Sequence, residues 1–192
     1  MKNFDGHIII SEIDQSLVKD KIKIIPHSAE KYIAFWIDDL KFLDSFSFLP
    51  SSLDNLSSNL SVEQKDKFLR QLFPNDTSLL LKKACLPYEY LTDFDKFNDD
   101  LPDKSHFYSS LSESEVDQEV YDHVKSVWSN FKCKNLKDLH DIYLKVDVLL
   151  LAAVFENFRE TSMTAFNIDP LHHFSSPGLT WAASLKKNKG LT

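Results

Sequence analysis

Glycine is scarce in this sequence, whose 192 residues include only Gly6, Gly178 and Gly190. Loops that wrap phosphate groups need several closely spaced glycines, because the backbone must approach the ligand without interference from a Cβ atom. Neither a GxGxxG pattern nor a Walker-type loop can be drawn from these three positions. The sequence therefore excludes dinucleotide binding of the Rossmann kind and P-loop nucleotide binding.

Cysteines are few and long apolar runs are missing. Cys85 and Cys133 form no CxxC pair, so they predict neither a disulfide framework nor a zinc site. No apolar run approaches the roughly 18 residues of a membrane span, and the first residues lack the pattern of a signal peptide. We expect an intracellular protein with no membrane partner, in the nucleus, a mitochondrion or a viral factory.

Positive charge is not in excess either, since the formal net charge is −7. This balance argues against a domain whose main task is to coat nucleic acid with lysines. It is compatible with a metal-dependent nuclease, because such enzymes gather carboxylates where divalent cations bind.

Hydrophobic periodicity predicts strands first and helices afterwards, which is typical of a mixed α/β layer fold. Residues 21–26 predict a short strand. The aromatic segments 31–37 and 40–48, separated by Asp38-Asp39, predict a hairpin. Helices are expected at residues 6–19, 50–60, 61–73, 112–131 and 136–166.

Capping signals mark two of these helices. Ser61 with Gln64, and Ser112 with Glu115, have the spacing of a capping box. Between the helices at 61–73 and 112–131, we expect a long, ordered loop from Pro74 to His106. A proline-containing tail follows Phe166.

The helix at 136–166 carries a carboxylate in an otherwise apolar run. Tyr143 and Asp147 lie four residues apart, so they share one stripe of the helix surface, beside its apolar face. The pair is either a solvent-facing pair near the helix edge or part of a site that meets a cation. His140, one turn before Tyr143, is expected to be structural.

A second acidic residue, Asp5, lies at a turn before the first predicted helix. In that position an aspartate commonly caps the helix. Two carboxylates from distant segments, with a tyrosine beside one, would also suit a metal-assisted hydrolase, in which each carboxylate holds a divalent ion.

These residues resemble known motifs. NFDGHIII, at residues 3–10, looks like the second exonuclease motif of family B DNA polymerases, and YLKVD, at 143–147, looks like the third. Further segments resemble the protein-primed branch of that family, which is carried by viruses, linear plasmids and Polinton/Maverick-type transposons. These segments are KFLDSFSFLPSSLDNL, KKACLPYEYL, FYSSLSESEVDQEVY, residues 140–159 and FSSPGLTW.

The resemblance implies a partial ribonuclease-H-like exonuclease fold, with a short β-hairpin sheet followed by long helices. Residues 1–166 would form the C-terminal part of a 3′→5′ exonuclease domain. Residues 167–192 would begin the connection toward the polymerase palm.

It also implies roles for individual residues. Asp5 and Asp147 would bind two Mg²⁺ or Mn²⁺ ions, and Tyr143 would orient the attacking water as a neutral phenol. Phe4 would contact the unpaired 3′ end of single-stranded DNA. Ser45 is the candidate for a further contact with that strand, and Ser52-Leu53 is the alternative.

The first exonuclease motif, an Asp-x-Glu on a strand, is expected upstream of Met1, and the palm motifs are expected downstream of Thr192. We therefore expect the chain to be inactive alone and to need the remainder of the polymerase, with a terminal-protein primer as a further partner. The alternative is a non-catalytic remnant, derived from a transposon or virus, that acts as an interaction module.

Overall fold

The computed structural model describes residues 23–28, 31–37, 39–75, 77–82, 85–110 and 113–188. The helix expected at 6–19 lies outside these residues. Contacts divide the chain into two compact units. The first contains Met1–Ser51 and Phe158–Thr192, and the second contains Ser52–Asn157.

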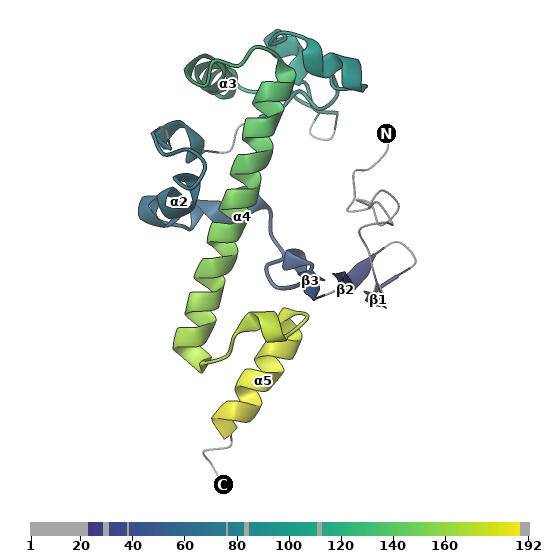
Figure 1. Cartoon of the computed structure of the whole chain (residues 1–192), viewed down its shortest axis with the longest axis vertical. Helices are drawn as coiled ribbons and strands as arrows, with labels where there is room; N and C mark the ends of the chain where they lie inside the picture. Colours follow the sequence, from purple (N-terminus) through teal and green to yellow (C-terminus); the bar gives the residue numbers. More distant parts are fainter. Residues whose placement is uncertain are drawn as a thin grey trace. The chain divides into compact units, whose positions relative to one another are not determined.

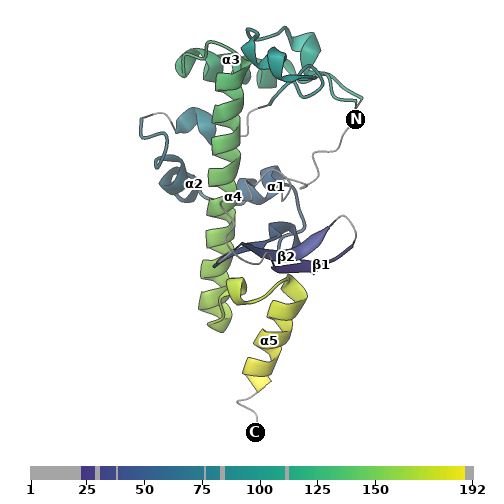
Figure 2. The same cartoon turned by 45° about the vertical axis from the view of Figure 1, so that its right-hand side comes forward.

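A three-stranded antiparallel sheet forms part of the first unit (Figure 1 and Figure 2). Its strands are β1 (Lys23–Pro26), β2 (Tyr32–Ile37) and β3 (Leu40–Leu43), in that order. Phe35 of β2 pairs with Phe42 of β3, and their rings stack with centroids 4.5 Å apart. Such cross-strand aromatic pairs stabilise a sheet. The predicted strand and hairpin are therefore confirmed.

The third strand is shorter than predicted, because it ends at Leu43 instead of continuing to Phe48. The carboxylate of Asp44 accepts a hydrogen bond from the Phe46 amide at 2.9 Å, and a 3₁₀ helix follows at Ser45–Ser47. Aspartate readily makes this local bond, which competes with strand pairing.

The tail after Phe166 contains a helix that the sequence reasoning missed, α5 (Ser176–Asn188), preceded by a 3₁₀ turn at Pro170–His172. Ser176 Oγ donates to the Phe48 carbonyl oxygen at 2.6 Å. On the sheet side, Lys41 Nζ donates to the Leu171 carbonyl oxygen at 3.0 Å and lies over the Phe174 ring. These contacts join the sheet segment to the C-terminal part of the first unit.

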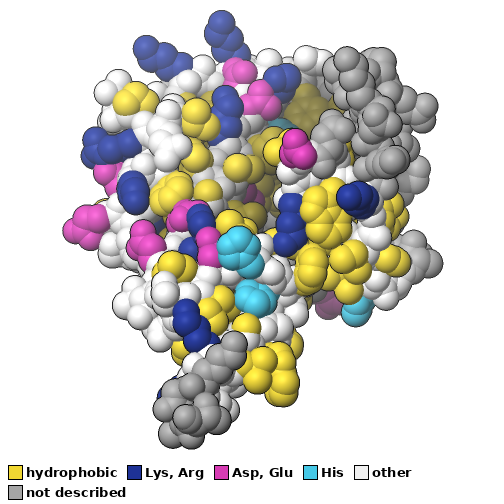
Figure 3. Space-filling view, turned by 60° about the horizontal axis from the view of Figure 1, so that its bottom comes forward, with side chains coloured by type: hydrophobic (Ala, Val, Ile, Leu, Met, Phe, Trp, Pro, Cys, Tyr) yellow, Lys and Arg dark blue, Asp and Glu magenta, His cyan; other side chains and the backbone are white. Residues whose placement is uncertain are grey.

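Several large apolar side chains of this unit remain open to solvent. They include Ile24, Leu40, Phe42, Phe46, Phe166, Trp181 and Leu185. Figure 3 shows hydrophobic side chains at the surface, interspersed with lysines and arginines.

The second unit begins with two short helices, as predicted. Ser52 caps α1 (Leu53–Ser58), and Ser61 forms a capping box with Gln64 at the start of α2 (Val62–Leu69). The following loop is irregular, as expected. It contains short 3₁₀ turns at Ser78–Leu80, Phe94–Asn98 and Lys104–Phe107.

Helix α3 (Gln118–Asn130) starts later than predicted. The expected cap by Ser112 and Glu115 is wrong, because the residue at the N-cap is Asp117. Ser114 instead pairs with Ser109 in an isolated antiparallel bridge. This bridge closes a turn in which Glu113 has a φ of 50°, and the helix begins only after it.

Helix α4 (Leu136–Phe166) has the bounds predicted from the sequence. At its start, the Asn135 side chain accepts a hydrogen bond from the Asp138 amide at 3.1 Å. At its end, Asn167 has a φ of 51°, and its amide bonds to the Met163 carbonyl oxygen. An asparagine in the left-handed region commonly ends a helix.

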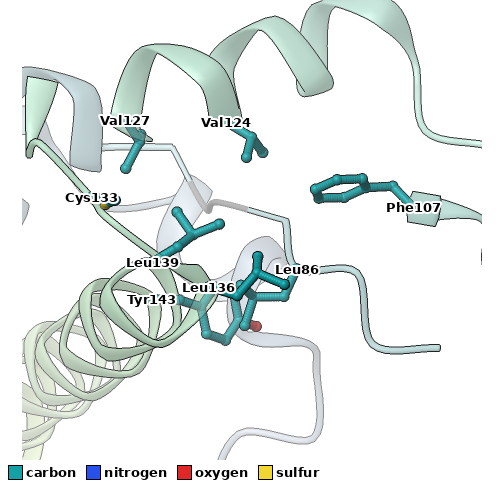
Figure 4. Packing of buried hydrophobic residues seen from close by; sticks show 8 residues of the cluster. All are labelled: Leu86, Phe107, Val124, Val127, Cys133, Leu136, Leu139 and Tyr143. Atoms are coloured by element: carbon teal, nitrogen blue, oxygen red, sulfur yellow. The ribbon is translucent and has the colours of Figure 1, made fainter. Parts of the chain in front are cut away.

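In the second unit, α4 contributes to two hydrophobic clusters. The first cluster, drawn in Figure 4, contains Leu86, Phe107, Val124, Val127, Cys133, Leu136, Leu139 and Tyr143. The second cluster contains Leu69, Leu80, Val146, Leu149 and Leu150. The structure is therefore a mixed α/β arrangement, with a small antiparallel sheet followed by helices. Within the described residues, none of the helices is both long and apolar enough to cross a membrane.

Candidate functional site

Tyr143 and Asp147 lie where the two clusters of the second unit meet along α4. Tyr143 belongs to the first cluster, and Val146 belongs to the second. Asp147 is half-buried, between the buried Val146 and the exposed Val148. The carboxylate therefore sits at the border of the apolar face, as the helical spacing predicted, and its Oδ1 atom is buried.

Tyr143 is held by a second tyrosine. Its side chain is 9% exposed and belongs to the cluster drawn in Figure 4, together with Leu86 and Leu136. The hydroxyl groups of Tyr88 and Tyr143 are hydrogen-bonded to each other, with their oxygens 2.7 Å apart. The two rings meet edge to face, with centroids 6.2 Å apart and an interplanar angle of 83°. Edge-to-face pairs are favourable because the positive ring edge meets the negative ring face.

The surroundings keep the Tyr143 phenol neutral. Burial raises the pKa of the Tyr143 phenol above the ordinary value of 10. The hydrogen bond with Tyr88 raises this pKa further. The nearby Asp147 carboxylate also raises it, through its charge and through hydrogen bonding. Partial desolvation also raises the pKa of Tyr88. At physiological pH, Tyr143 therefore acts as a hydrogen-bonding phenol and not as a base.

The other predicted site residues have different positions. Asp5 and Phe4 lie outside the described residues. Ser45 begins the 3₁₀ helix of the first unit and is half-buried, and its hydroxyl makes no hydrogen bond to another described residue. The alternative, Ser52, uses its hydroxyl to accept from the Asn55 amide and cap α1.

His140 has a structural position. Its ring packs edge to face against Phe97, with centroids 5.1 Å apart, and its Nδ1 lies 3.6 Å from Asp141 Oδ1. These contacts explain why His140 lies at this position, and they give it no role at the pair formed by Tyr88 and Tyr143.

Asp147 supplies carboxylate oxygens, which are the ligands that Mg²⁺ and Mn²⁺ prefer. Among the residues the structure describes, however, no group of three or more His, Cys, Asp or Glu side chains could hold a metal ion. A metal at Asp147 would therefore need further ligands from outside the described residues.

Comparison with known proteins identifies the class of this chain. A family model described as "DNA polymerase type B, organellar and viral" matches residues 1–187. The chain belongs to this family of type B DNA polymerases, as the motif resemblance predicted.

A curated relative supports the same assignment. It is a protein of Ascobolus immersus named "Probable DNA polymerase", which is 26% identical over 179 residues. The match covers 92% of this chain and 13% of the relative. The chain thus spans a small part of the length of that protein. No solved structure matches this chain.

Sequence reasoning did not identify Tyr88 as part of this site. Tyr88 lies in the irregular loop, 55 positions before Tyr143, so no periodic pattern connects the two. The signal in the sequence was the aromatic segment PYEYL, which indicates an ordered loop but does not indicate its contact with α4.

Proposed function

We propose that this chain supplies part of the 3′→5′ proofreading exonuclease of a protein-primed DNA-directed DNA polymerase. Residues 1–166 would belong to a ribonuclease-H-like exonuclease domain, and residues 167–192 would begin the connection to the palm. The observation that carries the proposal is the Tyr143–Asp147 pair, held at the edge of a packed core on one rigid helix. Family membership supports its assignment to a polymerase.

In this proposal the carboxylates and the phenol have different tasks. Asp5 and Asp147 would hold the two divalent metal ions, and Tyr143 would orient a water molecule with its neutral hydroxyl group. The bound Mg²⁺ or Mn²⁺ ions would polarise the phosphate oxygens and favour ionisation of the attacking water. The raised pKa of Tyr143 supports the orienting role, because a phenol that stays protonated retains its donor.

The proposed substrate is the unpaired 3′ end of single-stranded DNA. Phe4 would stack on a base, and the Ser45 hydroxyl would contact the strand. The remaining partners would be the rest of the polymerase, which contributes the first Asp-x-Glu motif, and a terminal protein that primes synthesis. We expect the chain alone to be inactive for lack of that motif.

The first prediction concerns metal binding at Asp147. Mn²⁺ is paramagnetic and broadens nearby resonances, so millimolar Mn²⁺ added to the isotopically labelled full chain should broaden the signals of residues around Asp5 and Asp147. The change Asp147→Asn should abolish the effect around residue 147. Asp141→Asn is the matched control, because Asp141 lies on the same helix and pairs with Lys137 at 2.7 Å.

Absence of broadening around Asp147, or equal broadening in the Asp147→Asn and Asp141→Asn chains, would contradict the proposed metal site. The same samples should be mixed with a single-stranded oligonucleotide that carries a labelled 3′ end. We expect no nucleotide release. Mn²⁺-dependent release that is lost in Asp147→Ala would show instead that the chain is active by itself.

A further inference from the structure

Tyr88 is 62% exposed, but the backbone on both sides of it is packed or hydrogen-bonded. The two residues before it, Leu86 and Pro87, are buried. After it, the amides of Tyr90 and Leu91 both bond to the Pro87 carbonyl oxygen, at 3.1 and 3.2 Å. A buried anchor followed by a hydrogen-bonded turn thus fixes the position from which the Tyr88 side chain reaches α4.

The hydroxyl group of Tyr143 has two hydrogen-bonding partners. A phenol has one proton to donate and two lone pairs that can accept. The hydroxyl oxygens of Tyr88 and Tyr143 are hydrogen-bonded at 2.7 Å. Asp147, one turn along the helix, is the second hydrogen-bonding partner of Tyr143. Neighbouring hydrogen bonds in such a chain polarise one another.

Tyr90, two residues away, provides a contrast within the same turn. Its hydroxyl donates to Asp99 Oδ2 at 2.6 Å and also accepts from Lys96 Nζ at 3.4 Å. These contacts stay within the loop. Tyr90 therefore stabilises the loop, whereas Tyr88 contacts Tyr143 of the candidate site.

We propose that Tyr88 is a positioning residue of the exonuclease site, which holds the Tyr143 hydroxyl group in its place beside Asp147, where it would orient the attacking water. Tyr88 itself need not touch the substrate. This inference rests on the proposed function, since it gives Tyr88 a role through the side chain that orients the water.

The test is nuclear magnetic resonance of the full chain with tyrosine labelled with ¹³C at the ring carbon that carries the hydroxyl. Tyr88→Phe keeps the ring and removes the hydrogen-bonded hydroxyl group. We expect the Tyr143 resonance to shift and its hydroxyl proton to exchange faster with water. Tyr90→Phe is the matched control, because it also removes one hydrogen-bonded hydroxyl from this loop, and it should leave the Tyr143 signals in place.

A second measurement separates positioning from simple loss of structure. Mn²⁺ should bind at Asp147 of the Tyr88→Phe chain with an unchanged midpoint, while its broadening of the Tyr143 ring signal changes. The reciprocal Tyr143→Phe should shift the Tyr88 resonance. It provides the same information if Tyr88→Phe does not fold.

Tyr143 signals that are the same in Tyr88→Phe as in the unmodified chain would overturn the positioning inference and leave the metal test unaffected. Shifted Tyr143 signals, with no effect of Mn²⁺ at Asp147, would overturn the proposed exonuclease. In that case the hydrogen bond would remain only as a contact of the fold. Equal shifts in Tyr88→Phe and Tyr90→Phe would also overturn the inference, because the effect would then belong to the loop as a whole.

Discussion

Asp169 shows how a single carboxylate stabilises the turn after α4 in the first unit. Arg159 of α4 binds it through two bonds, Nε to Oδ1 at 3.1 Å and Nη2 to Oδ2 at 2.6 Å. The Leu171 amide donates to the same carboxylate at 3.0 Å. The arginine, together with that amide, lowers the pKa of Asp169 from 3.8 to about 2. Two-point pairs of this kind are stronger than single hydrogen bonds.

We therefore predict that Asp169→Asn lowers the free energy of unfolding at neutral pH by about 1–3 kcal/mol, because the variant loses charge-assisted hydrogen bonds. The folded pKa lies below the unfolded one, so the carboxylate contributes its full stability above about pH 4. This contribution disappears as the pH falls through the interval from 3.8 toward about 2. Urea unfolding at several pH values measures both effects.

Glu160→Gln is the control for this experiment, because Glu160 is an exposed acidic residue next to Arg159 on the same helix. It should change stability by less than about 0.5 kcal/mol. Similar losses in the two variants, or an Asp169→Asn chain whose stability falls with acid as steeply as that of the unmodified chain, would refute the assigned ion pair.

At the scale of the element, α4 is apolar on more than its buried face. Val146 is 2% exposed, whereas Val148, two positions later, is 58% exposed. Leu144 and Leu151 are exposed near Val148 on the helix. Position along the helix, and not residue type, therefore decides which of these side chains stabilise the core.

The two valines give a matched prediction. Val146→Ala should lower the free energy of unfolding by about 2 kcal/mol, because it removes buried methyl groups and leaves a small cavity. Val148→Ala should have nearly no effect or stabilise slightly, since alanine favours the helix by up to about 0.7 kcal/mol. Urea unfolding of both variants measures the difference. Equal losses would show that the assigned face of α4 is wrong.

The bounds of α4 could be predicted from the sequence because periodicity and its capping asparagine agree. The start of α3 could not, because a bridge between Ser109 and Ser114, made by residues outside the helix, overrides the capping signal. Helix α5 was missed because Pro177 and Gly178 suggest a loop. A proline is nevertheless tolerated in the first turn of a helix, where the amide has no intrahelical partner.

The candidate site, too, could be predicted only in part from the sequence. The neighbourhood of Tyr143 and Asp147 follows from helical spacing alone, because residues four apart share a helix face. The contact from Tyr88 depends on how an irregular loop folds back on α4. No local pattern encodes such a long-range contact, so only the structure shows it.

At the scale of the whole molecule, charge is divided unevenly between the two units. In the second unit acidic residues outnumber basic ones and account for the net charge of −7, whereas the two kinds balance in the first. Ser45 belongs to the first unit, where Lys41 is close in sequence. A strand of DNA held by this unit would therefore encounter little net charge.

This distribution leads to the last prediction, which concerns the salt dependence of DNA binding. A single strand held mainly by stacking and hydrogen bonding displaces few counterions, so its affinity should fall only slowly with added salt. We expect a plot of log K against log salt concentration with a slope shallower than about −2, because each neutralised phosphate contributes about −0.7 for single strands. Fluorescence anisotropy of a labelled single-stranded oligonucleotide measures it.

Two serine variants complete this experiment. Ser45→Ala should weaken binding at every salt concentration without a change of slope, since a hydroxyl neutralises no phosphate. Ser52→Ala should leave DNA affinity unchanged and lower the free energy of unfolding by about 1 kcal/mol, because Ser52 caps α1. The reverse pattern would transfer the strand contact to Ser52, the alternative that the sequence left open. A slope as steep as about −5 would mean that lysines and arginines dominate binding, which would contradict the proposed stacking of the 3′ end.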